Sequence, residues 1–365
     1  MQESPAHLPT LNRDRIISGE ILKFYQTHAL FRERYRVLKQ LGQGGFGVTY
    51  LAQDLKLPGQ PYCVIKQLCP KTKNEVSLER AKIRFRREAR ALANLGSHSQ
   101  IPRLLDYFTT SGEFYLVQDY IQGQTLAQEV RQSGQQTEAQ VKYFLSEIIP
   151  VVHFIHRNRI IHRDIKPPNI IRSTLDRRLV LIDFGAVREF LADIDEVTAH
   201  QAAASQFVGT PGFAPPEQLA LRPCCSSDIY ALGMTCLFLL TGRTPIEFDQ
   251  EPRTGRVRWQ QAVTVSSHFA SVLDKMLMPD PNDRYPSAEA LGRALALEPH
   301  LDTLAQCMHT KPPLSPDANA GPAIAEDYYL TPIQREAQAI RKWRNRRFNQ
   351  EPPRLSRSND SISLP

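Results

Sequence analysis

Long apolar runs are absent from this sequence of 365 residues. The best candidate, residues 229–240, is about a dozen residues long and contains Gly233, whereas a membrane-spanning helix needs roughly 18 apolar residues. We therefore expect no transmembrane receptor. The first thirty residues mix acidic, basic and apolar side chains, without the cationic start and continuous apolar core typical of a secretory signal. The sequence thus predicts a cytoplasmic protein.

Paired cysteines are also missing. The chain has six cysteines and none belongs to a CxxC pair, so neither a disulfide framework nor a zinc ligand set is indicated. We expect reduced thiols. Cys224 and Cys225 are adjacent, which leaves a redox switch as the alternative to two small residues placed ahead of a helix.

Excess charge is confined to one segment. The net charge is +7, but seven Arg and one Lys stand against two Glu between Arg335 and Arg357, so this segment alone contributes +6. The rest of the chain is close to neutral. Because the overall composition is ordinary, with 41% hydrophobic and 23% charged residues, collagen, coiled coil and wholesale disorder are disfavoured.

The hydropathy pattern divides the chain. Residues 35–120 are mostly strand-like, with short β-branched and aromatic runs at 35–41, 48–52, 62–68 and 114–120 that are broken by Gly and Pro, and with one helical period at residues 77–95. Helical patterns dominate from Thr125 to about Leu297, including residues 137–158, 227–241, 266–278 and 286–297, with a short β-rich insert at 168–187. This predicts an α+β fold with a small β-rich lobe carrying one main helix, then a larger, mostly helical lobe. A proline-rich segment follows and reads as an extended linker.

Three glycines, Gly42, Gly44 and Gly47, form a GxGxxG pattern. In dinucleotide-binding folds such glycines open a helix, whereas here the strand-like residues 48–52 follow them. The pattern therefore predicts the turn of a hairpin whose backbone N–H groups can lie over phosphates. A plain hairpin with permissive glycines is the structural alternative.

Lys66 ends the apolar run that begins at Val64, where a buried ammonium is costly unless it is paired or faces a ligand. Glu88, on the one helix of this lobe, is the available partner. We expect the pair to direct the amine toward phosphates, although either residue taken alone is better interpreted as a solvated surface charge.

The most specific stretch is residues 162–169, with sequence HRDIKPPN. Asp164 can orient a hydroxyl proton, Lys166 can neutralise a transferring phosphoryl group, and Asn169 can hold a metal ion. Asp183 follows a short strand and precedes Phe184 and Gly185, where its carboxylate is placed to ligate Mg²⁺.

Together these motifs resemble the protein kinase signature set, over about residues 35–297. Lys166 and Thr210 are typical of the serine/threonine branch of the family. The segments GTPGFAPPEQ and DIYALG resemble those of bacterial Hanks-type kinases, in particular cyanobacterial ones. The resemblance implies an N-terminal extension (1–34), an N-lobe (35–118), a hinge (119–123), a C-lobe (124–297), a Pro-rich linker (298–331) and a basic, Ser-rich tail (332–365).

The resemblance also implies a role for each matched residue. Asp164 and Lys166 are expected to be catalytic, and Asn169 and Asp183 to bind Mg²⁺, with Mn²⁺ as a substitute. The expected ATP-binding residues are Leu41, Gly42, Gln43, Gly44, Gly45, Phe46, Gly47, Thr49, Lys66, Glu88, Asp119 and Ile121. Activation-segment hydroxyls are expected at Thr198, Ser205 and Thr210, and structural roles fall to Glu217, Asp228 and Arg284.

Some positions depart from the family pattern. Thr49, Val64 and Pro215 replace the usual Val, Ala and Ala, which are conservative changes in shape. Gln118 occupies the expected gatekeeper position, so we expect a back pocket with a polar mouth. No catalytic group is missing, and a pseudokinase is therefore not favoured.

The resulting expectation is an ATP- and Mg²⁺-dependent protein serine/threonine kinase that phosphorylates protein substrates and itself. A kinase-like scaffold with weak or no catalysis is the alternative. Phosphate on Thr198 or Ser205 would pair with Arg163, unless acidic residues order the segment unaided. Residues 332–349 could form a basic amphipathic helix that binds a membrane surface or another anionic partner, or could be a solvated tail. No specific nucleic-acid motif is present.

Overall fold

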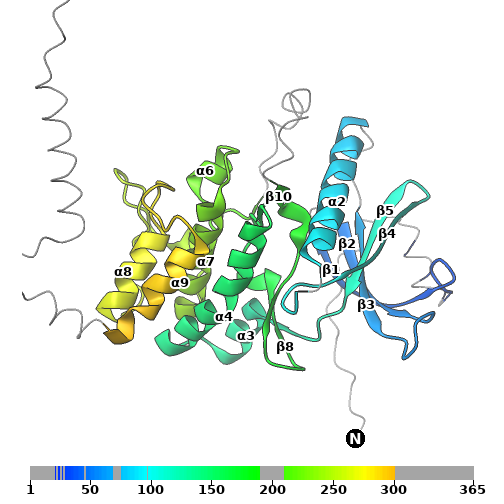
Figure 1. The fold of residues 1–365 in the computed structure, drawn as a ribbon, viewed down its shortest axis with the longest axis horizontal. Coiled ribbons are helices and arrows are strands. Elements are labelled where there is room, and N and C mark those ends of the chain that lie inside the picture. The colour runs from blue at the N-terminus through cyan, green and yellow to red at the C-terminus, as the bar shows by residue number, and fades with distance from the viewer. Residues whose placement is uncertain are drawn as a thin grey trace, which may run out of the picture. The chain divides into compact units, whose positions relative to one another are not determined.

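The structure is a computed structural model, and it describes residues 29–44, 47–68, 75–96, 98–189 and 209–300, together with Ile21, Phe24 and Thr27. These residues form the two lobes that the sequence predicts (Figure 1). A five-stranded antiparallel sheet with one long helix makes the N-lobe, and the helices α3, α4 and α6 to α9 make most of the C-lobe.

The N-lobe sheet has the strand order β1-β2-β3-β5-β4, with every neighbouring pair antiparallel. Burial along β2 alternates except at Leu51, which is buried together with Tyr50 and Ala52, so one face of the strand packs on the core and the other is only partly accessible. The elements are β1 (Tyr35–Gly44), β2 (Gly47–Asp54), β3 (Tyr62–Leu68), α2 (Glu75–Leu95), β4 (Leu104–Thr110) and β5 (Glu113–Asp119).

The helix expected over residues 77–95 begins two residues earlier, at Glu75, and ends as expected at Leu95. It contacts β4, β5 and the short helix η2 of the C-lobe, so it reaches from one lobe to the other. Strand β4 was not predicted, because its sequence LLDYFTT lacks clean alternation and its pairing with β5 shifts register between Leu104 and Asp106.

Residues that precede the first strand complete the N-lobe core. Ile21 and Phe31 are fully buried against Tyr35, Tyr115 and Val117, and Phe24 packs on the same cluster. The rings of Phe24 and Phe31 meet edge to face with centroids 5.3 Å apart. Part of the segment expected as an N-terminal extension therefore supports the sheet.

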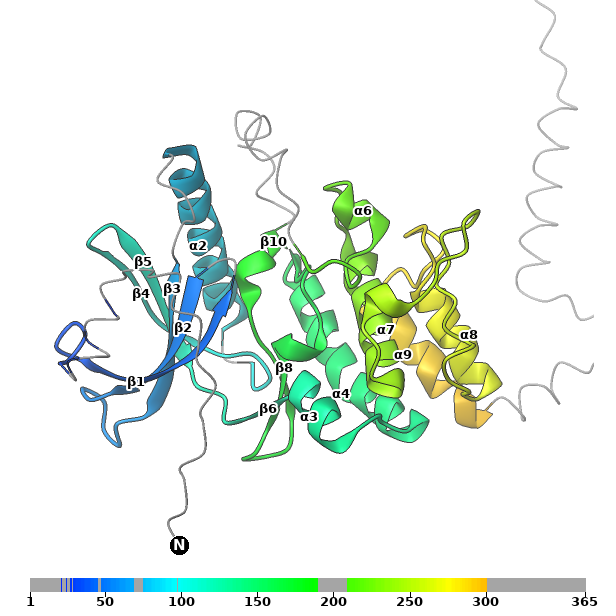
Figure 2. The same ribbon diagram turned by 180° about the vertical axis from the view of Figure 1, so that it is seen from behind.

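The C-lobe is built around α7 (Cys225–Thr241), which is buried on nearly all sides and contacts α4, α8 and α9 (Figure 2). This helix holds residues 229–240, the longest apolar run, so that run is a core helix surrounded by other helices. Among the described residues, no helix has the length and apolarity to span a bilayer.

Side-chain caps mark the beginnings of the other long helices of this lobe. The Thr125 and Thr137 side chains accept hydrogen bonds from the backbone N–H groups of Gln128 and Gln140, and each glutamine side chain bonds back to the cap. The long helices are α3 (Leu126–Ser133), α4 (Glu138–Arg157), α8 (Ser267–Met276) and α9 (Ala288–Ala296), and the short elements are β6 (Gly123–Thr125), β7 (Ile160–Ile161), η1 (Pro167–Asn169), β8 (Ile170–Ser173), β9 (Leu179–Leu181), η2 (Phe184–Ala186), β10 (Arg188–Glu189), α6 (Pro216–Leu219), η3 (Pro245–Glu247) and η4 (Glu298–His300).

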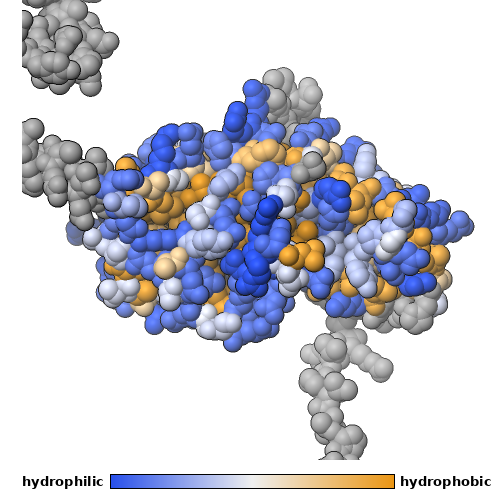
Figure 3. Space-filling model, turned by 60° about the horizontal axis from the view of Figure 1, so that its bottom comes forward, coloured by the Kyte–Doolittle hydropathy of each residue, from blue (hydrophilic) through white to orange (hydrophobic). Residues whose placement is uncertain are grey.

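The hydropathy of one face of the molecule is typical of a globular protein. On the face drawn in Figure 3, hydrophilic residues predominate and hydrophobic ones lie among them in scattered patches. Such a mixture is normal, because apolar atoms make up over half of a folded protein's surface.

Candidate functional site

Three charged side chains from three different elements meet between the lobes. Lys66 on β3 donates to Glu88 Oε1 on α2 at 2.7 Å and to Asp183 Oδ1, at the start of η2, at 3.1 Å. The side chains of Lys66 and Glu88 are 16% and 5% exposed, whereas that of Asp183 is 44% exposed. The cluster is therefore buried on one side and open at Asp183.

The electrostatics of this cluster keep its amine charged. Burial alone would lower the pKa of Lys66, but Asp183 and Glu88 together raise it above the ordinary value. The charge of Lys66 holds the pKa of Asp183 below its usual range, against the effect of burial. Burial raises the pKa of Glu88, and Lys66 opposes that rise. The Lys66 ammonium can therefore bind an anionic ligand, and the partly exposed Asp183 carboxylate beside it can bind the cation that accompanies that ligand.

A second polar group surrounds Asp164. Asn169 Nδ2 donates to Asp164 Oδ2 at 2.9 Å and also to the backbone oxygen of Asp164 at 2.9 Å. Lys166 Nζ lies 2.9 Å from Asp164 Oδ2. Thr210 closes the ring, since its hydroxyl donates to Asp164 Oδ1 at 2.8 Å and accepts from Lys166 at 2.6 Å. The carboxylate of Asp164 is thus fixed on both oxygens.

The backbone on which Asp164 sits is anchored by Asp228 of α7. The backbone N–H groups of His162 and Arg163 donate to the two oxygens of Asp228, each at 2.9 Å. Asp228 is fully buried, and the hydrogen bond from His156 holds its pKa below the usual range although burial acts in the opposite direction. Sequence reasoning assigned Asp228 but missed His156, because the motif does not extend to that helix.

Two residues of this region have left-handed backbone conformations. Arg163 has φ 65° and Asp183 has φ 68°, and non-glycine residues in this region concentrate at functional sites. The ring of buried His162 meets that of Phe184 edge to face at 4.8 Å, and burial lowers the pKa of His162. This stacking joins residues 162–169 to residues 183–185.

The glycine hairpin forms as expected. β1 and β2 pair antiparallel up to Gly44 and Gly47, and a Cβ at Gly47 would lie 1.9 Å from the backbone oxygen of Gln67. Only glycine therefore allows β3 to approach this closely. Thr49 lies directly opposite Lys66 on the neighbouring strand. Of the expected loop residues, Leu41, Gly42 and Gln43 are exposed, whereas Gly45 and Phe46 lie outside the described residues.

The connection between the lobes carries a polar clamp. Arg103 Nε donates to Asp119 Oδ2 at 2.8 Å, and the backbone N–H of Asp119 donates to the oxygen of Arg103. Within the part of the chain that the structure describes, the backbone N–H and C=O of Ile121 have no hydrogen-bond partner. Gln118, just before this segment, is 5% exposed and pairs with Val64 and Leu104 on the two adjacent strands.

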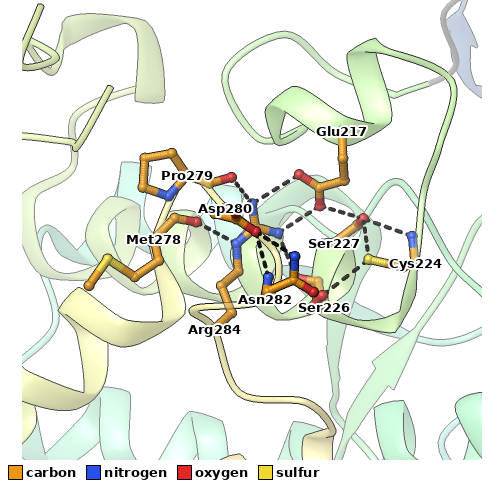
Figure 4. A network of polar contacts seen from close by, with 9 residues as sticks. All are labelled: Glu217, Cys224, Ser226, Ser227, Met278, Pro279, Asp280, Asn282 and Arg284. Carbon is orange, nitrogen blue, oxygen red and sulfur yellow. Dashed lines mark hydrogen bonds and ion pairs between the residues drawn. The ribbon is translucent and has the colours of Figure 1, made fainter. Parts of the chain in front are cut away.

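Glu217 and Arg284 form a buried, two-pronged ion pair away from this site (Figure 4). Arg284 Nη1 and Nη2 contact the two oxygens of Glu217 at 2.6 and 2.9 Å, and the same guanidinium also donates to the backbone oxygens of Met278, Pro279 and Ser226. Ser227 Oγ donates to Glu217 at 2.7 Å. Ser227 is a second residue that sequence reasoning missed.

The remaining expectations fall on a segment that the structure only partly describes. Arg163 donates to the backbone oxygens of Ala186 and Val187, and Gln218, also unpredicted, donates to the oxygen of Arg163 at 2.7 Å. Thr198 and Ser205 lie outside the described residues, as do the linker and tail beyond residue 300. Those predictions stay predictions.

The side chains that meet here fit a divalent cation and a phosphorylated ligand. Asp183 offers a partly exposed carboxylate, and Asn169, whose amide N–H groups are directed to Asp164, offers its amide oxygen. Such oxygens are preferred by Mg²⁺ when phosphate oxygens complete the coordination. Within the described ranges, no group of three or more His, Cys, Asp or Glu residues is arranged so that it could hold a metal ion by itself, so a metal ion here would share its coordination with a ligand.

Comparisons with known proteins place this geometry in a family. Residues 35–295 match the protein kinase domain. The chain is 51% identical over 284 residues to serine/threonine-protein kinase B of Synechocystis sp., covering 76% of this chain and 49% of that protein. It is 43% identical over 270 residues to serine/threonine-protein kinase PknA of Nostoc sp., covering 73% and 48%.

A solved structure shares the fold. The kinase domain of PknI from Mycobacterium tuberculosis matches with a TM-score of 0.57 at 24% identity, covering 74% of this chain and 97% of that domain. The chain spans about half the length of the two curated relatives named above. The likeness therefore covers their shared domain and not the whole of those proteins.

Proposed function

Since the chain belongs to the protein kinase family, whose members use ATP and a divalent metal, we propose that it is an active, Mg²⁺-dependent protein serine/threonine kinase that phosphorylates protein substrates and itself. Support comes from one observation above all. Lys66, Glu88 and Asp183 are brought together from β3, α2 and η2, beside the ring of Asp164, Lys166 and Thr210.

In this proposal Asp164 orients the acceptor hydroxyl. The hydroxyl oxygen forms a bond to the γ-phosphorus while the bond between that phosphorus and the β,γ-bridging oxygen breaks, and Asp164 accepts the hydroxyl proton. Asn169 and Thr210 hold the carboxylate in place, since both hydrogen-bond to it. Lys166 contributes positive charge beside the transferred group. Positioning and charge are the protein's main contributions to this reaction.

The nucleotide would be held mainly by backbone groups and Lys66. The glycine hairpin at 42–47 would cover the phosphates, Lys66 would bind them, and Glu88 would keep the amine in position. Ile121, whose backbone donor and acceptor lack partners among the described residues, would hydrogen-bond the base. Asp183 and Asn169 would bind Mg²⁺, which neutralises phosphate charge when present.

The test is autophosphorylation with labelled ATP, comparing the wild-type chain with Asp164→Ala. We expect a loss of at least about a hundredfold in the variant. Asp176→Ala is the matched control, because Asp176 is an exposed aspartate in a turn of the same lobe. Equal labelling of wild type and Asp164→Ala, or no labelling of either, would favour the alternative of a kinase-like scaffold.

Two finer proposals concern regions outside the described residues. Phosphate on Thr198 or Ser205 would pair with Arg163. Mass spectrometry that finds neither residue phosphorylated in the active enzyme would reject this proposal.

The basic segment 332–349 would bind an anionic membrane surface. Co-sedimentation with anionic vesicles that is sensitive to salt and is lost on truncation at Thr310 would support this proposal. The cytoplasmic location stays a prediction.

A further inference from the structure

Gln118 lies on the face of the N-lobe sheet that carries Lys66. The strand register places Lys66 directly opposite Leu116, and Val64 directly opposite Gln118. Because side chains two positions apart on a strand point to the same face, Val64, Lys66 and Gln118 share one face. Gln118 is the diagonal neighbour of Lys66, and such positions are about 7–8 Å apart. It therefore lies on the side of the sheet from which Lys66 reaches Asp183.

The side-chain amide of Gln118 is buried without a partner. The residue is 5% exposed, and the positions beside it in the sheet are Leu51, Val64 and Leu104, none of which has a polar side chain. Among the residues that the structure describes, no hydrogen bond or ion pair is made by its side chain. Since buried polar groups are normally hydrogen-bonded, we expect the partner of this amide to come from a ligand.

Gln67 on the adjacent strand provides the contrast. It is 1% exposed, but it lies on the opposite face of β3, and its Nε2 donates to Glu113 Oε2 at 2.8 Å. That face packs on the cluster that contains Ile65 and Tyr115. A glutamine on the core side is thus satisfied by the chain itself, whereas Gln118, on the side of Lys66, is not.

Ile121, three residues after Gln118, offers both a donor and an acceptor to a base. Its backbone N–H and C=O lack partners within the described ranges. N1 of a 6-aminopurine accepts a hydrogen bond and would bind the N–H, whereas N1–H of a 6-oxopurine donates and would bind the C=O. The backbone of Ile121 therefore does not by itself select between the two classes of base.

The amide of Gln118 can serve both classes as well. The exocyclic group at C6 is next to N1 in a purine, so a base bound at Ile121 brings this group toward the long side chain of Gln118. The amide oxygen accepts from the amino group of adenine, and after a half-turn of the amide its nitrogen donates to the oxygen of guanine or hypoxanthine. A side chain that only accepts would place two oxygens face to face and reject the oxo group.

We propose that Gln118 hydrogen-bonds the exocyclic group at C6 of the purine base, so that the site takes 6-oxopurine nucleotides as phosphoryl donors as well as ATP. The inference rests on the proposed function, since the same residues carry out the transfer. The acceptor hydroxyl oxygen bonds to the γ-phosphorus of inosine triphosphate (ITP), and the bond from that phosphorus to the β,γ-bridging oxygen breaks. Inosine diphosphate leaves, and Asp164 accepts the hydroxyl proton.

The experiment measures the binding of three nucleotide probes to the full chain by calorimetry in the presence of Mg²⁺. The probes are the β,γ-imido analogues of ATP, ITP and purine riboside triphosphate, whose bases carry an amino group, an oxygen and only hydrogen at C6. We expect the amino and oxo probes to bind within about tenfold of each other, and each about fivefold more tightly than the hydrogen probe. Binding of the oxo probe no tighter than that of the hydrogen probe would overturn the proposal.

The variant Gln118→Met removes the amide and keeps the length of the side chain. It should weaken binding of the amino and oxo probes by about fivefold and leave the hydrogen probe unchanged, because that probe has no group at C6 for the amide to bind. Equal weakening of all three probes would overturn the proposal. Each ratio compares probes on the same protein, so a loss of stability in the variant does not affect it.

Gln67→Met is the matched control. It makes the same substitution at a buried glutamine on the other face of the sheet, so the ratios between the three probes should stay those of the wild type. A change in these ratios as large as that in Gln118→Met would overturn the assignment of base recognition to Gln118.

Phosphoryl transfer is measured separately, with labelled ATP and labelled ITP and a peptide substrate. We expect values of kcat/KM within about tenfold of each other, in line with the expected binding. Transfer from ATP without transfer from ITP would overturn the inference and leave the kinase proposal standing. A chain that binds the probes in the expected order but transfers from neither nucleotide would contradict the kinase proposal and support the role of Gln118.

Discussion

Two ion pairs in this molecule join a basic side chain to a glutamate at similar distances but differ in what else surrounds them. Lys66 contacts Glu88 at 2.7 Å beside the partly exposed Asp183, while Arg284 contacts Glu217 at 2.6 Å with none of its side chain exposed. Arg284 also donates to three backbone oxygens, whereas Lys66 donates to two carboxylates.

This difference indicates that the Lys66–Glu88 pair can bind a ligand, whereas the Arg284–Glu217 pair stabilises the fold. A buried charge must be compensated, and Arg284 is compensated entirely by its own chain. Lys66 faces an excess of negative charge next to an open carboxylate, so a cation and a phosphorylated ligand can rearrange its contacts. Stability should therefore depend more on Arg284, and phosphoryl transfer more on Lys66.

The largest expected effect is on stability, from Arg284→Met. Removing the guanidinium leaves the Glu217 carboxylate with the Ser227 hydroxyl but without its cation, and leaves three backbone oxygens without their donor, so we expect the free energy of unfolding to fall by about 3–5 kcal/mol in urea denaturation. Arg293→Met is the control, because Arg293 and Glu289 form an exposed pair on α9. Similar losses in the two variants would contradict the assignment of Arg284 as a structural residue.

The next effect is on activity, from Lys66→Met and Asp183→Asn. Each should leave a folded protein and should lower phosphoryl transfer by about a hundredfold or more. Steady-state assays with labelled ATP check the second statement and thermal unfolding checks the first. Near-normal activity in either variant would remove that residue from the site.

A third pair, His156 and Asp228, extends the comparison, because its contribution to stability depends on pH. The folded state raises the pKa of His156 from 6.5 to about 9, so its stabilising effect is complete below pH 6.5 and is lost as the pH rises through 9. We expect the free energy of unfolding to fall by about 2 kcal/mol more in wild type than in His156→Asn over that range. Parallel pH profiles for the two proteins would show that the ring is not charged in the fold.

The smallest expected effect is on stability and comes from Ser227, at the edge of the Glu217–Arg284 contacts. Ser227→Ala removes the hydroxyl that donates to Glu217, whose carboxylate keeps Arg284. The free energy of unfolding should fall by about 1 kcal/mol, with activity unchanged. A loss as large as that of Arg284→Met would mean that the hydroxyl and not the guanidinium fixes Glu217.

Local patterns were enough to predict the strands β1, β2, β3 and β5 and the helices α2, α4, α7, α8 and α9, because alternation and helical periodicity are strong in those segments. They missed β4, where the register shift near Asp106 hides the alternation. They also gave no sign that Ile21 and Phe24 belong to the N-lobe core, since a few apolar residues at irregular spacing have no periodicity.

The sequence by itself determined the two-lobed fold, the glycine hairpin and the identity of the charged residues, since spacing within a motif is a property of the chain. The sequence also predicted that Lys66 pairs with Glu88, whereas only the tertiary structure decided which further charges meet. The contacts of Lys66 with Asp183 and of His156 with Asp228 join positions 117 and 72 residues apart. Contacts over such separations depend on how the lobes and helices pack, and no local pattern records that packing.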